Sequence, residues 1–234
     1  MLSRLPRALG ALTAVIAGVT ALGLIPAAAA TGSSRPPGPG ARPAATPPCG
    51  VFCASYFTEE YGSEYVLNDF RARQVAGTRV TLHYASNSDP AEDWTIWPTG
   101  TVRQLAAFGI VSHNLALHYG SDQAFEAEYA PYGTGSGLCA GLARTAANGE
   151  SVTLQECGQS GRTVWVIDAA DQSGSYTPLI NGSDTNFSDP QVLTEPGWPT
   201  RWPNPQLISY RLQTFANGTV YDDQMWNNTV GVLP

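Results

Sequence analysis

Short stretches of alternating hydrophobic and polar residues run along this chain, and they predict β-strands. In residues 79–84, RVTLHY, Val80 and Leu82 alternate with polar neighbours, and residues 152–157 keep the same two-residue period. Clusters of Gly, Asn, Asp, Ser and Pro separate these stretches, as in turns between short strands. Further strands are expected at residues 54–61, 64–70, 94–97, 101–105, 124–129, 165–167, 177–180, 191–194 and 207–212. The pattern predicts an all-β domain, because no long amphipathic helix interrupts it.

An internal repeat connects the strands. Residues 77–94 and 149–165 both read as Gly, a Val-Thr-Leu strand, a polar turn and then Trp, with one residue's difference in length. A more eroded third copy ends in the Gln-x-Trp of residues 224–226. Self-similarity of this kind points to a repeat architecture. Three β-rich copies predict a β-trefoil, in which three pseudo-symmetric four-strand repeats close a barrel and leave no bare strand edge.

We place the repeats at residues 54–105, 122–181 and 182–234. Residues 106–121 fit the repeat poorly and are treated as an insertion, whose apolar spacing allows either a short helix or a pair of strands. Each copy closes on a tryptophan, and these are Trp94, Trp165 and Trp226. We expect all three to pack in the core, since large aromatic side chains dominate core energetics.

The N-terminal segment predicts export. Arg4 and Arg7 precede an uncharged apolar run over residues 8–25, and small residues end at Ala30, so residues 1–30 are expected to be a cleaved signal peptide. An uncleaved membrane anchor is the competing interpretation, because the run is almost long enough to span a bilayer. Residues 31–48 are rich in Pro, Gly and Ser and predict a linker. Residues 49–234 then form a single β-trefoil-like domain.

The formal charge of the chain limits the classes of partner that we expect. From residue 49 onward the chain has 8 Arg, no Lys and 19 acidic residues, which gives a formal charge of −11. Such a surface argues against nucleic acid and anionic membranes as partners. The lack of lysine beside abundant Ala, Gly, Pro and Arg is typical of a high-GC bacterial genome. We expect a secreted, extracellular monomer.

All four cysteines lie in the part predicted to be exported, where an even number favours disulfides. Three pairings are possible. We favour Cys139 with Cys157, which flank one hairpin-like unit, and this leaves Cys49 with Cys53. A zinc site is the competing interpretation, but three His and no Cys-x-x-Cys pair disfavour it. No metal or cofactor is therefore expected.

Residues 139–165 carry a family likeness. Their Cys…Gly-x-x-Val-x-Leu-x-x-Cys…Trp pattern resembles the ricin B-chain type β-trefoil, whose copies read C-L-D-V…V-Q-L-W-x-C…N-Q-x-W. The likeness covers most of residues 56–226 and implies a lectin-like carbohydrate-binding fold. In this family the sugar pocket uses the Asp of C-L-D-V, the Gln and Trp of Q-L-W, and the Asn-Gln before the last Trp. No copy of this chain keeps the full set, so the resemblance implies a modified site.

The polar residues at the family's pocket positions are the ligand-binding candidates. In the first copy they are Asn68, Asp69, His83 and Glu92, and in the third they are Asp223 and Gln224. Carboxylate and amide groups beside an imidazole are suited to bind sugar hydroxyls. A solvated turn with a histidine on a strand surface is the competing interpretation for the first copy. The second copy, with Gly141, Thr153, Gln155 and Thr163 at these places, keeps little to bind a sugar.

Two further candidates, Trp198 and Trp202, lie in a Pro-rich loop at residues 195–205. Exposed tryptophans there could stack on a pyranose ring or on a protein partner. Alternatively, the loop folds down as a lid on the barrel. His83 and His118, both in Leu-His-Tyr, are predicted to mark similar strands and not a metal site.

No catalytic motif is present: the chain lacks a Gly-x-Ser-x-Gly elbow, a His-Glu-x-x-His pair and a phosphate-binding loop. We therefore expect a secreted non-catalytic binding protein with glycans as the first-choice ligand. One alternative is a protein-interaction or protease-inhibitor-like trefoil module that acts on an extracellular protein. Another is a hydrolase with an unrecognised site, which two close buried carboxylates in one cleft would favour.

Overall fold

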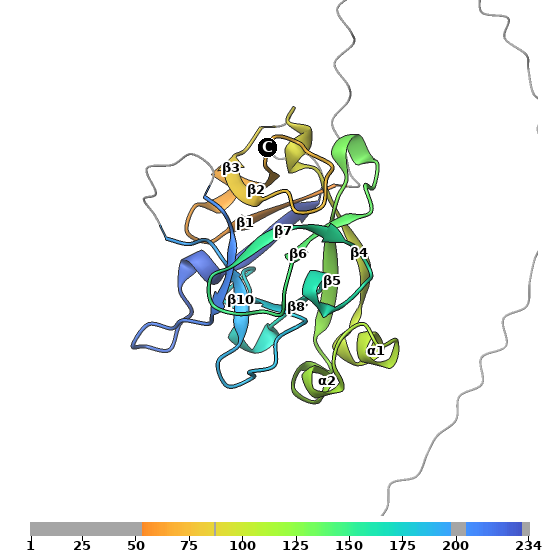
Figure 1. Ribbon diagram of the computed structural model, residues 1–234. Helices are drawn as coiled ribbons and strands as arrows, with labels where there is room; N and C mark the ends of the chain where they lie inside the picture. The colour runs from red at the N-terminus through yellow and green to blue at the C-terminus, as the bar shows by residue number, and fades with distance from the viewer. Residues whose placement is uncertain (1–52, 87, 198–204, 231–234) are drawn as a thin grey trace, which may run out of the picture. The chain divides into compact units, whose positions relative to one another are not determined.

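Strands make up most of the regular structure in the described residues, which are 53–86, 88–197 and 205–230 of the computed structural model (Figure 1). The strands are β1 Ala54–Thr58, β2 Tyr65–Asp69, β3 Val80–Tyr84, β4 Trp94–Thr101, β5 Gln123–Tyr129, β6 Leu138–Leu142, β7 Glu150–Glu156, β8 Trp165–Ile167, β9 Leu179–Asn181, β10 Gln191–Thr194, β11 Ile208–Arg211 and β12 Trp226–Val230. Two short helices follow β4, α1 (Val102–Ala107) and α2 (His113–Tyr119). Neither is long and apolar enough to cross a bilayer, and no other helix of the described residues is. The domain is all-β, as the alternation predicts.

Strand pairing closes the sheet on itself. The order β5–β6–β7–β11–β10–β9–β8 returns to β5, because β8 also pairs with β5, and this makes a ring of seven antiparallel strands. Beyond the ring, β4 pairs with β5, β1 with β4, and β12 with β1. The strands β2 and β3 form a separate hairpin. Closure protects strand edges that would otherwise be free to pair with another chain.

Three buried tryptophans make the same kind of hydrogen bond. In each case the indole Nε1 donates to a backbone carbonyl on an earlier strand: Trp94 to Leu67 at 2.9 Å, Trp165 to Ala140 at 2.9 Å and Trp226 to Leu193 at 2.8 Å. All three side chains, predicted to be core residues, are at most 1 % exposed. Each tryptophan also lies two residues after a 3-10 helix, and these helices are η3 (Pro90–Glu92), η5 (Gly161–Thr163) and η7 (Asp222–Gln224).

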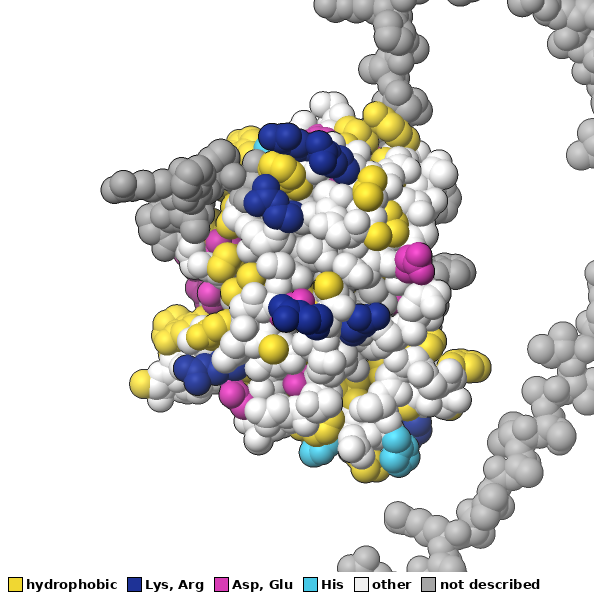
Figure 2. Space-filling model, in the orientation of Figure 1, with side chains coloured by type: hydrophobic (Ala, Val, Ile, Leu, Met, Phe, Trp, Pro, Cys, Tyr) yellow, Lys and Arg dark blue, Asp and Glu magenta, His cyan; other side chains and the backbone are white. Residues whose placement is uncertain are grey.

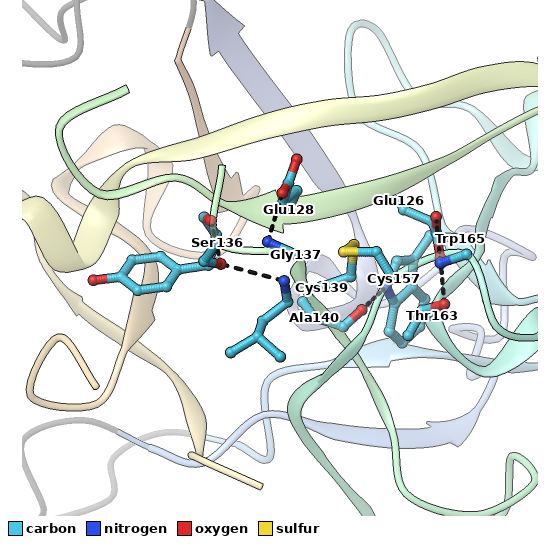
Figure 3. The surroundings of a disulfide bond; sticks show 12 residues. Glu126, Glu128, Ser136, Gly137, Cys139, Ala140, Cys157, Thr163 and Trp165 are labelled. Atoms are coloured by element: carbon cyan, nitrogen blue, oxygen red, sulfur yellow. Dashed lines mark hydrogen bonds between the residues drawn. A yellow bond between two sulfur atoms is a disulfide. The ribbon is translucent and has the colours of Figure 1, made fainter. Parts of the chain in front are cut away.

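The disulfide favoured by the cysteine spacing joins Cys139 in β6 to Cys157, directly after β7 (Figure 3). Beside it lies Glu126, which is 2 % exposed. Its carboxylate accepts hydrogen bonds from the Gly158 N–H at 2.9 Å and from the Thr163 hydroxyl. Cys53 is also disulfide-bonded, and Cys49, the partner predicted for it, lies outside the described residues.

The prediction of a strand at residues 101–105 is wrong. Thr101 ends β4 and caps α1: its hydroxyl accepts the Gln104 N–H at 3.3 Å, and the Gln104 Oε1 accepts the Thr101 N–H at 2.8 Å. This capping box starts the helix within the range expected to be strand. The expected insertion, residues 106–121, contains the end of α1 and all of α2, so its helical alternative is the right one, although α1 begins within the range assigned to the first repeat. The buried faces of these helices pack against Val166, Ile180 and Val192.

His118 therefore lies on α2 and not on a strand, so the prediction that it marks a strand like that of His83 is wrong. Its ring stacks on Phe187 with centroids 4.3 Å apart. The tripeptide Leu-His-Tyr is thus helical at one site and strand at the other, because the flanking chain and not the tripeptide decides its conformation.

Charged side chains on the face drawn in Figure 2 are scattered among uncharged ones, with a group of arginines at the top. In the described residues, Arg71 and Arg79 lie over the ring of Phe70 at 4.9 and 4.3 Å. Phe70 directly follows β2, so the edge of this hairpin is basic although the whole chain has a formal charge of −7.

Candidate functional site

A pocket of about 200 Å³ opens where the β1–β2 connection, the segment after β10 and the β11–β12 connection meet. Four acidic side chains, three aromatic side chains and one glycine line it. They are Glu60, Tyr61, Glu195, Gly197, Phe215, Tyr221, Asp222 and Asp223. A concave site with aromatic surface and convergent polar groups is the usual form of a small-molecule site.

Backbone hydrogen bonds hold the three segments around the pocket. The Glu195 N–H donates to the Asp223 carbonyl at 3.0 Å, which ties the end of β10 to η7. The Glu59 N–H donates to the Met225 carbonyl at 2.8 Å and ties the β1–β2 connection to the same region. Gly197 has a φ of 79°, which a glycine adopts without strain, and so the chain turns directly after Glu195. The carboxylates are therefore carried by a fixed backbone.

Phe215 and Tyr221 form the aromatic wall. Their ring centroids are 4.2 Å apart and their planes meet at 78°, an edge-to-face pair. A tight turn presents Phe215: its N–H donates to the Thr219 carbonyl at 2.8 Å, and the Gly218 N–H donates to the Phe215 carbonyl at 2.9 Å. Phe215 is 47 % exposed, so part of its ring is free to contact a ligand.

The carboxylate of Glu195 and one oxygen of Asp223 are buried acceptors. Glu195 is fully buried, and neither of its oxygens makes a hydrogen bond of good geometry within the described residues. Burial, and next the charge of Asp223, raise the pKa of Glu195 to about 7, although the Gly197 N–H and the Tyr61 hydroxyl lower it. The Asp223 Oδ1 is also buried without a partner in this part of the chain. Burial, with the charge of Glu60, raises the pKa of Asp223 to about 6.

The pocket consequently offers acceptors that a ligand with hydroxyl or ammonium donors could satisfy. Leaving such buried groups unpaired costs free energy, which a donor from the ligand would recover. Tyr61 belongs to the same electrostatic group, because burial and then the charges of Glu195 and Glu60 raise the pKa of its hydroxyl. Strongly shifted pKa values in a cleft are typical of functional sites.

Of the candidates predicted for the third copy, Asp223 lines this pocket and Gln224 does not. Gln224 is fully buried, and its amide is used inside the protein. Its Nε2 donates to the Thr194 hydroxyl at 3.0 Å and to the Arg211 carbonyl at 2.9 Å, while its Oε1 accepts the Gln213 N–H at 2.7 Å. Its contacts are those of a structural residue. The predicted candidates Trp198 and Trp202 lie outside the described residues.

Of the first-copy candidates, the structure brings His83 and Glu92 together. The His83 Nδ1 lies 3.6 Å from the Glu92 Oε1. Glu92 is 5 % exposed, and burial raises its pKa to about 8, although the Ser86 N–H, which donates to Oε2 at 2.7 Å, lowers it.

Asn68 and Asp69 lie in the β2–β3 hairpin. Asn68 faces Thr81 across the hairpin, and its backbone carbonyl accepts the Thr81 hydroxyl at 3.4 Å. Asp69 is fully buried, and burial raises its pKa to about 7, while the backbone and charge of Arg73 lower it. Both side chains are thus in the interior of the hairpin region, and neither lines the pocket.

Reasoning from the sequence missed most of the pocket. Glu60, Tyr61, Glu195, Phe215 and Tyr221 were not among the candidates. Two signals were present: Glu195 follows Thr194 as Asp69 follows Asn68, and residues 215–218 read Phe-Ala-Asn-Gly, a turn sequence that carries an aromatic residue.

No protein-family model and no curated protein matches the chain. Solved structures match its fold. ThreeFoil, a designed 3-fold symmetric protein, superposes with a TM-score of 0.51 and 13 % identity over 75 % of this chain and 96 % of its own. The exo-beta-1,3-galactanase 1,3Gal43A from Clostridium thermocellum superposes with a TM-score of 0.52 and 10 % identity, over 76 % of this chain and 30 % of its own. A mosquitocidal holotoxin superposes with a TM-score of 0.50 and 11 % identity, over 76 % of this chain and 17 % of its own.

The chain therefore spans nearly all of the designed protein but less than a third of the galactanase and holotoxin chains. At these identities the likeness concerns the fold alone. It supports the class that the strand pairing indicates, an all-β domain with a trefoil-like fold.

Proposed function

We propose that the domain is a β-trefoil built from three four-strand repeats, β1–β4, β5–β8 and β9–β12. The repeated indole hydrogen bonds and the three matching 3-10 helices support this division. Trp226 in β12 also bridges to Thr177, just before β9, which would close β1, β4, β5, β8, β9 and β12 into a barrel. The third repeat then begins at β9 and not at residue 182.

The function we propose is that of a secreted, non-catalytic carbohydrate-binding module. One observation carries it: the pocket places the half-exposed ring of Phe215 beside the buried carboxylate of Glu195 and the buried Oδ1 of Asp223. Sugar hydroxyls donate hydrogen bonds to carboxylates, and the apolar face of a sugar ring stacks on an aromatic ring. The disulfide between Cys139 and Cys157 supports an oxidising, extracellular location.

The charge of the pocket selects among sugars. Among the described residues, four acidic side chains and no basic one line it, so a uronic or sialic acid would be repelled by this part of the pocket. Neutral and amino sugars are the expected ligands. Because a galactanase is among the structures of similar fold, β-1,3-linked galactose oligomers are the first neutral glycans to test.

A glycan array with the full chain, followed by calorimetry of the best binders, tests this function. We expect neutral or amino glycans to bind, and Phe215→Ala to weaken affinity about tenfold through loss of stacking. Phe108→Ala is the matched control, because Phe108 is 80 % exposed and outside the pocket. Absence of binding to every glycan at high protein concentration would refute the proposal, and so would equal losses in the two variants.

A hydrolase is the second candidate, and the coupled pair Glu195 and Asp223 favours it. Two carboxyl groups in one pocket, both with a pKa raised mainly by burial, are the kind of groups that act as acid and base in glycoside hydrolysis. Incubation of bound oligosaccharides with the chain distinguishes the two functions. If the wild-type chain releases reducing ends, and Glu195→Gln still binds the oligosaccharide but releases none, the function is catalysis and not binding alone.

A further inference from the structure

A second group of polar side chains lies at the connection between β3 and β4, and none of its members lines the pocket. It consists of His83 at the end of β3, Asp89 at the N-cap of η3, and Glu92 at the end of η3. One ligand atom from each residue lies within 4.8 Å of the other two. An ion between such atoms needs only small movements of the side chains to reach the bond lengths of about 2.0–2.2 Å that zinc adopts.

Glu92 supplies an independent indication of a ligand. Its side chain is 5 % exposed, and its Oε1 is buried without a hydrogen-bond partner in the described residues. The same oxygen lies 3.6 Å from the His83 Nδ1 and so faces the cluster. This nitrogen also lies 3.0 Å from the Tyr84 carbonyl, a contact that a metal bound to Nδ1 would replace. The other oxygen, Oε2, is already fixed by the Ser86 N–H at 2.7 Å. A buried carboxylate oxygen that lacks a hydrogen bond is costly, and a cation would offset that cost.

We propose that His83, Asp89 and Glu92 bind a divalent transition-metal ion, with zinc as the best match. One imidazole and two carboxylates form a mixed nitrogen and oxygen donor set, which suits zinc better than the all-oxygen sites that calcium and magnesium prefer. Two carboxylates also balance the charge of a divalent ion. Water would complete the coordination.

Backbone hydrogen bonds already hold the two carboxylate ligands in position. The Asp89 Oδ1 accepts the Ala91 N–H at 2.9 Å, which fixes this carboxylate and leaves Oδ2 for the ion. Glu92 is held by Ser86 in the same way. Since Trp94 follows η3 by two residues, a metal here would pin the turn that leads into a buried core tryptophan. The inference departs from the sequence-based expectation of no metal, because the ligand-binding candidates from the sequence include His83 and Glu92 but not Asp89.

Calorimetric titration of the full chain with zinc chloride tests the proposal, with cobalt absorption as a second measurement. We expect one equivalent to bind, and His83→Gln, Asp89→Asn and Glu92→Gln each to weaken binding about 10- to 100-fold. Asp89→Asn keeps an Oδ1 acceptor for the N-cap hydrogen bond, so weaker zinc binding in this variant would reflect the loss of a metal ligand and not of the cap. His118→Gln is the control, because it alters the same Leu-His-Tyr tripeptide on α2 and should leave affinity unchanged.

Absence of binding at about 1 mM zinc, or unchanged binding in all three variants, would overturn the site. Calcium bound more tightly than zinc would overturn the choice of ion. If a variant folds poorly, the wild-type chain still decides the question by NMR. Cobalt should broaden the imidazole signal of His83, and broadening confined to His113 and His118 would assign the metal elsewhere.

Discussion

Asp69 and Leu142 occupy corresponding places beside two buried tryptophans: each lies two residues after the carbonyl that accepts the indole hydrogen bond. Glu195 holds the third such position, two residues after Leu193. Asp69, Leu142 and Glu195 are all fully buried. The fold therefore accepts an apolar side chain at a position where two of three examples carry a carboxylate. The comparison with Leu142 predicts that each buried carboxylate lowers the free energy of unfolding.

Replacement of Asp69 by Leu should stabilise the domain at pH 8. Burial raises the pKa of Asp69 to about 7, and neither of its oxygens makes a hydrogen bond of good geometry among the described residues, so ionisation there is costly. We expect a gain on the order of 1 kcal/mol in the free energy of unfolding, measured with urea. Asp69→Asn, which stays polar, should gain less. A loss of stability in Asp69→Leu would show that the charge of Arg73 makes the carboxylate favourable.

Stability should fall as pH rises from about 4 to 8. The pKa values of Asp69, Glu92, Glu195 and Asp223 lie at about 7, 8, 7 and 6 in the folded chain, above the ordinary values of carboxyl groups. Between the two sets of values the folded state binds more protons than the unfolded state, so the unfolding free energy decreases with pH. Above the folded values it levels off.

The measurement is the melting temperature across this range. We expect it to be higher at pH 5 than at pH 8 by at least about 2–4 °C, equivalent to about 1 kcal/mol for a domain of this size. In Asp69→Leu the difference should shrink, because one of the titrating groups is gone. A melting temperature that rises with pH would contradict the burial of these carboxyl groups as protonated acids.

Replacement of any of the three core tryptophans by Phe should cost a similar amount. Each substitution removes the indole donor and leaves a buried carbonyl unpaired, as at Ala140 for Trp165→Phe. The expected loss is about 1–3 kcal/mol before any cavity contribution. Urea unfolding of Trp94→Phe, Trp165→Phe and Trp226→Phe measures it, with Tyr132→Phe as an exposed control. A negligible loss at one tryptophan alone would contradict the equivalence of the three positions.

Removal of the disulfide should destabilise the domain without changing its fold. Cys139 and Cys157 close a loop with a sequence separation of 18 residues, for which chain entropy accounts for about 3 kcal/mol. The double variant Cys139→Ala, Cys157→Ala isolates this bond, because a reductant would also break the disulfide of Cys53. Unfolding by urea, with circular dichroism as the check of the fold, measures the loss. Equal stability of variant and wild type would show that the reduced hairpin is already held by its strand pairing.

The strands and the core tryptophans could be predicted because their signals are local: a two-residue alternation and a closing Trp after each polar turn. Val102 and Leu105 are three residues apart, a spacing that fits one face of a helix, but two apolar positions are too few to establish a period, and so helix α1 was missed. Thr101 and Gln104 decided it through their capping box. A rule on caps would have found the helix where hydrophobic periodicity did not.

The pocket and the polar cluster were only partly predictable. Asp223 and the pair His83 and Glu92 were found because they sit at motif positions of a family that the chain resembles. Phe215 and Glu195 approach each other through the tie between β10 and η7, which joins residues far apart in the sequence. No local pattern encodes such a contact, so sequence reasoning passed over the aromatic half of the pocket.

The pairing of β1 with β12 has a consequence for how the chain reaches its fold. The two strands meet along five positions, from Ala54–Val230 to Thr58–Trp226. The first strand must wait for the last one, and such distant pairing slows folding. During the export that we propose, the chain would therefore remain unfolded at its first strand while it passes through a translocation channel. The topology delays the pairing of β1 with β12 until the final strand has emerged.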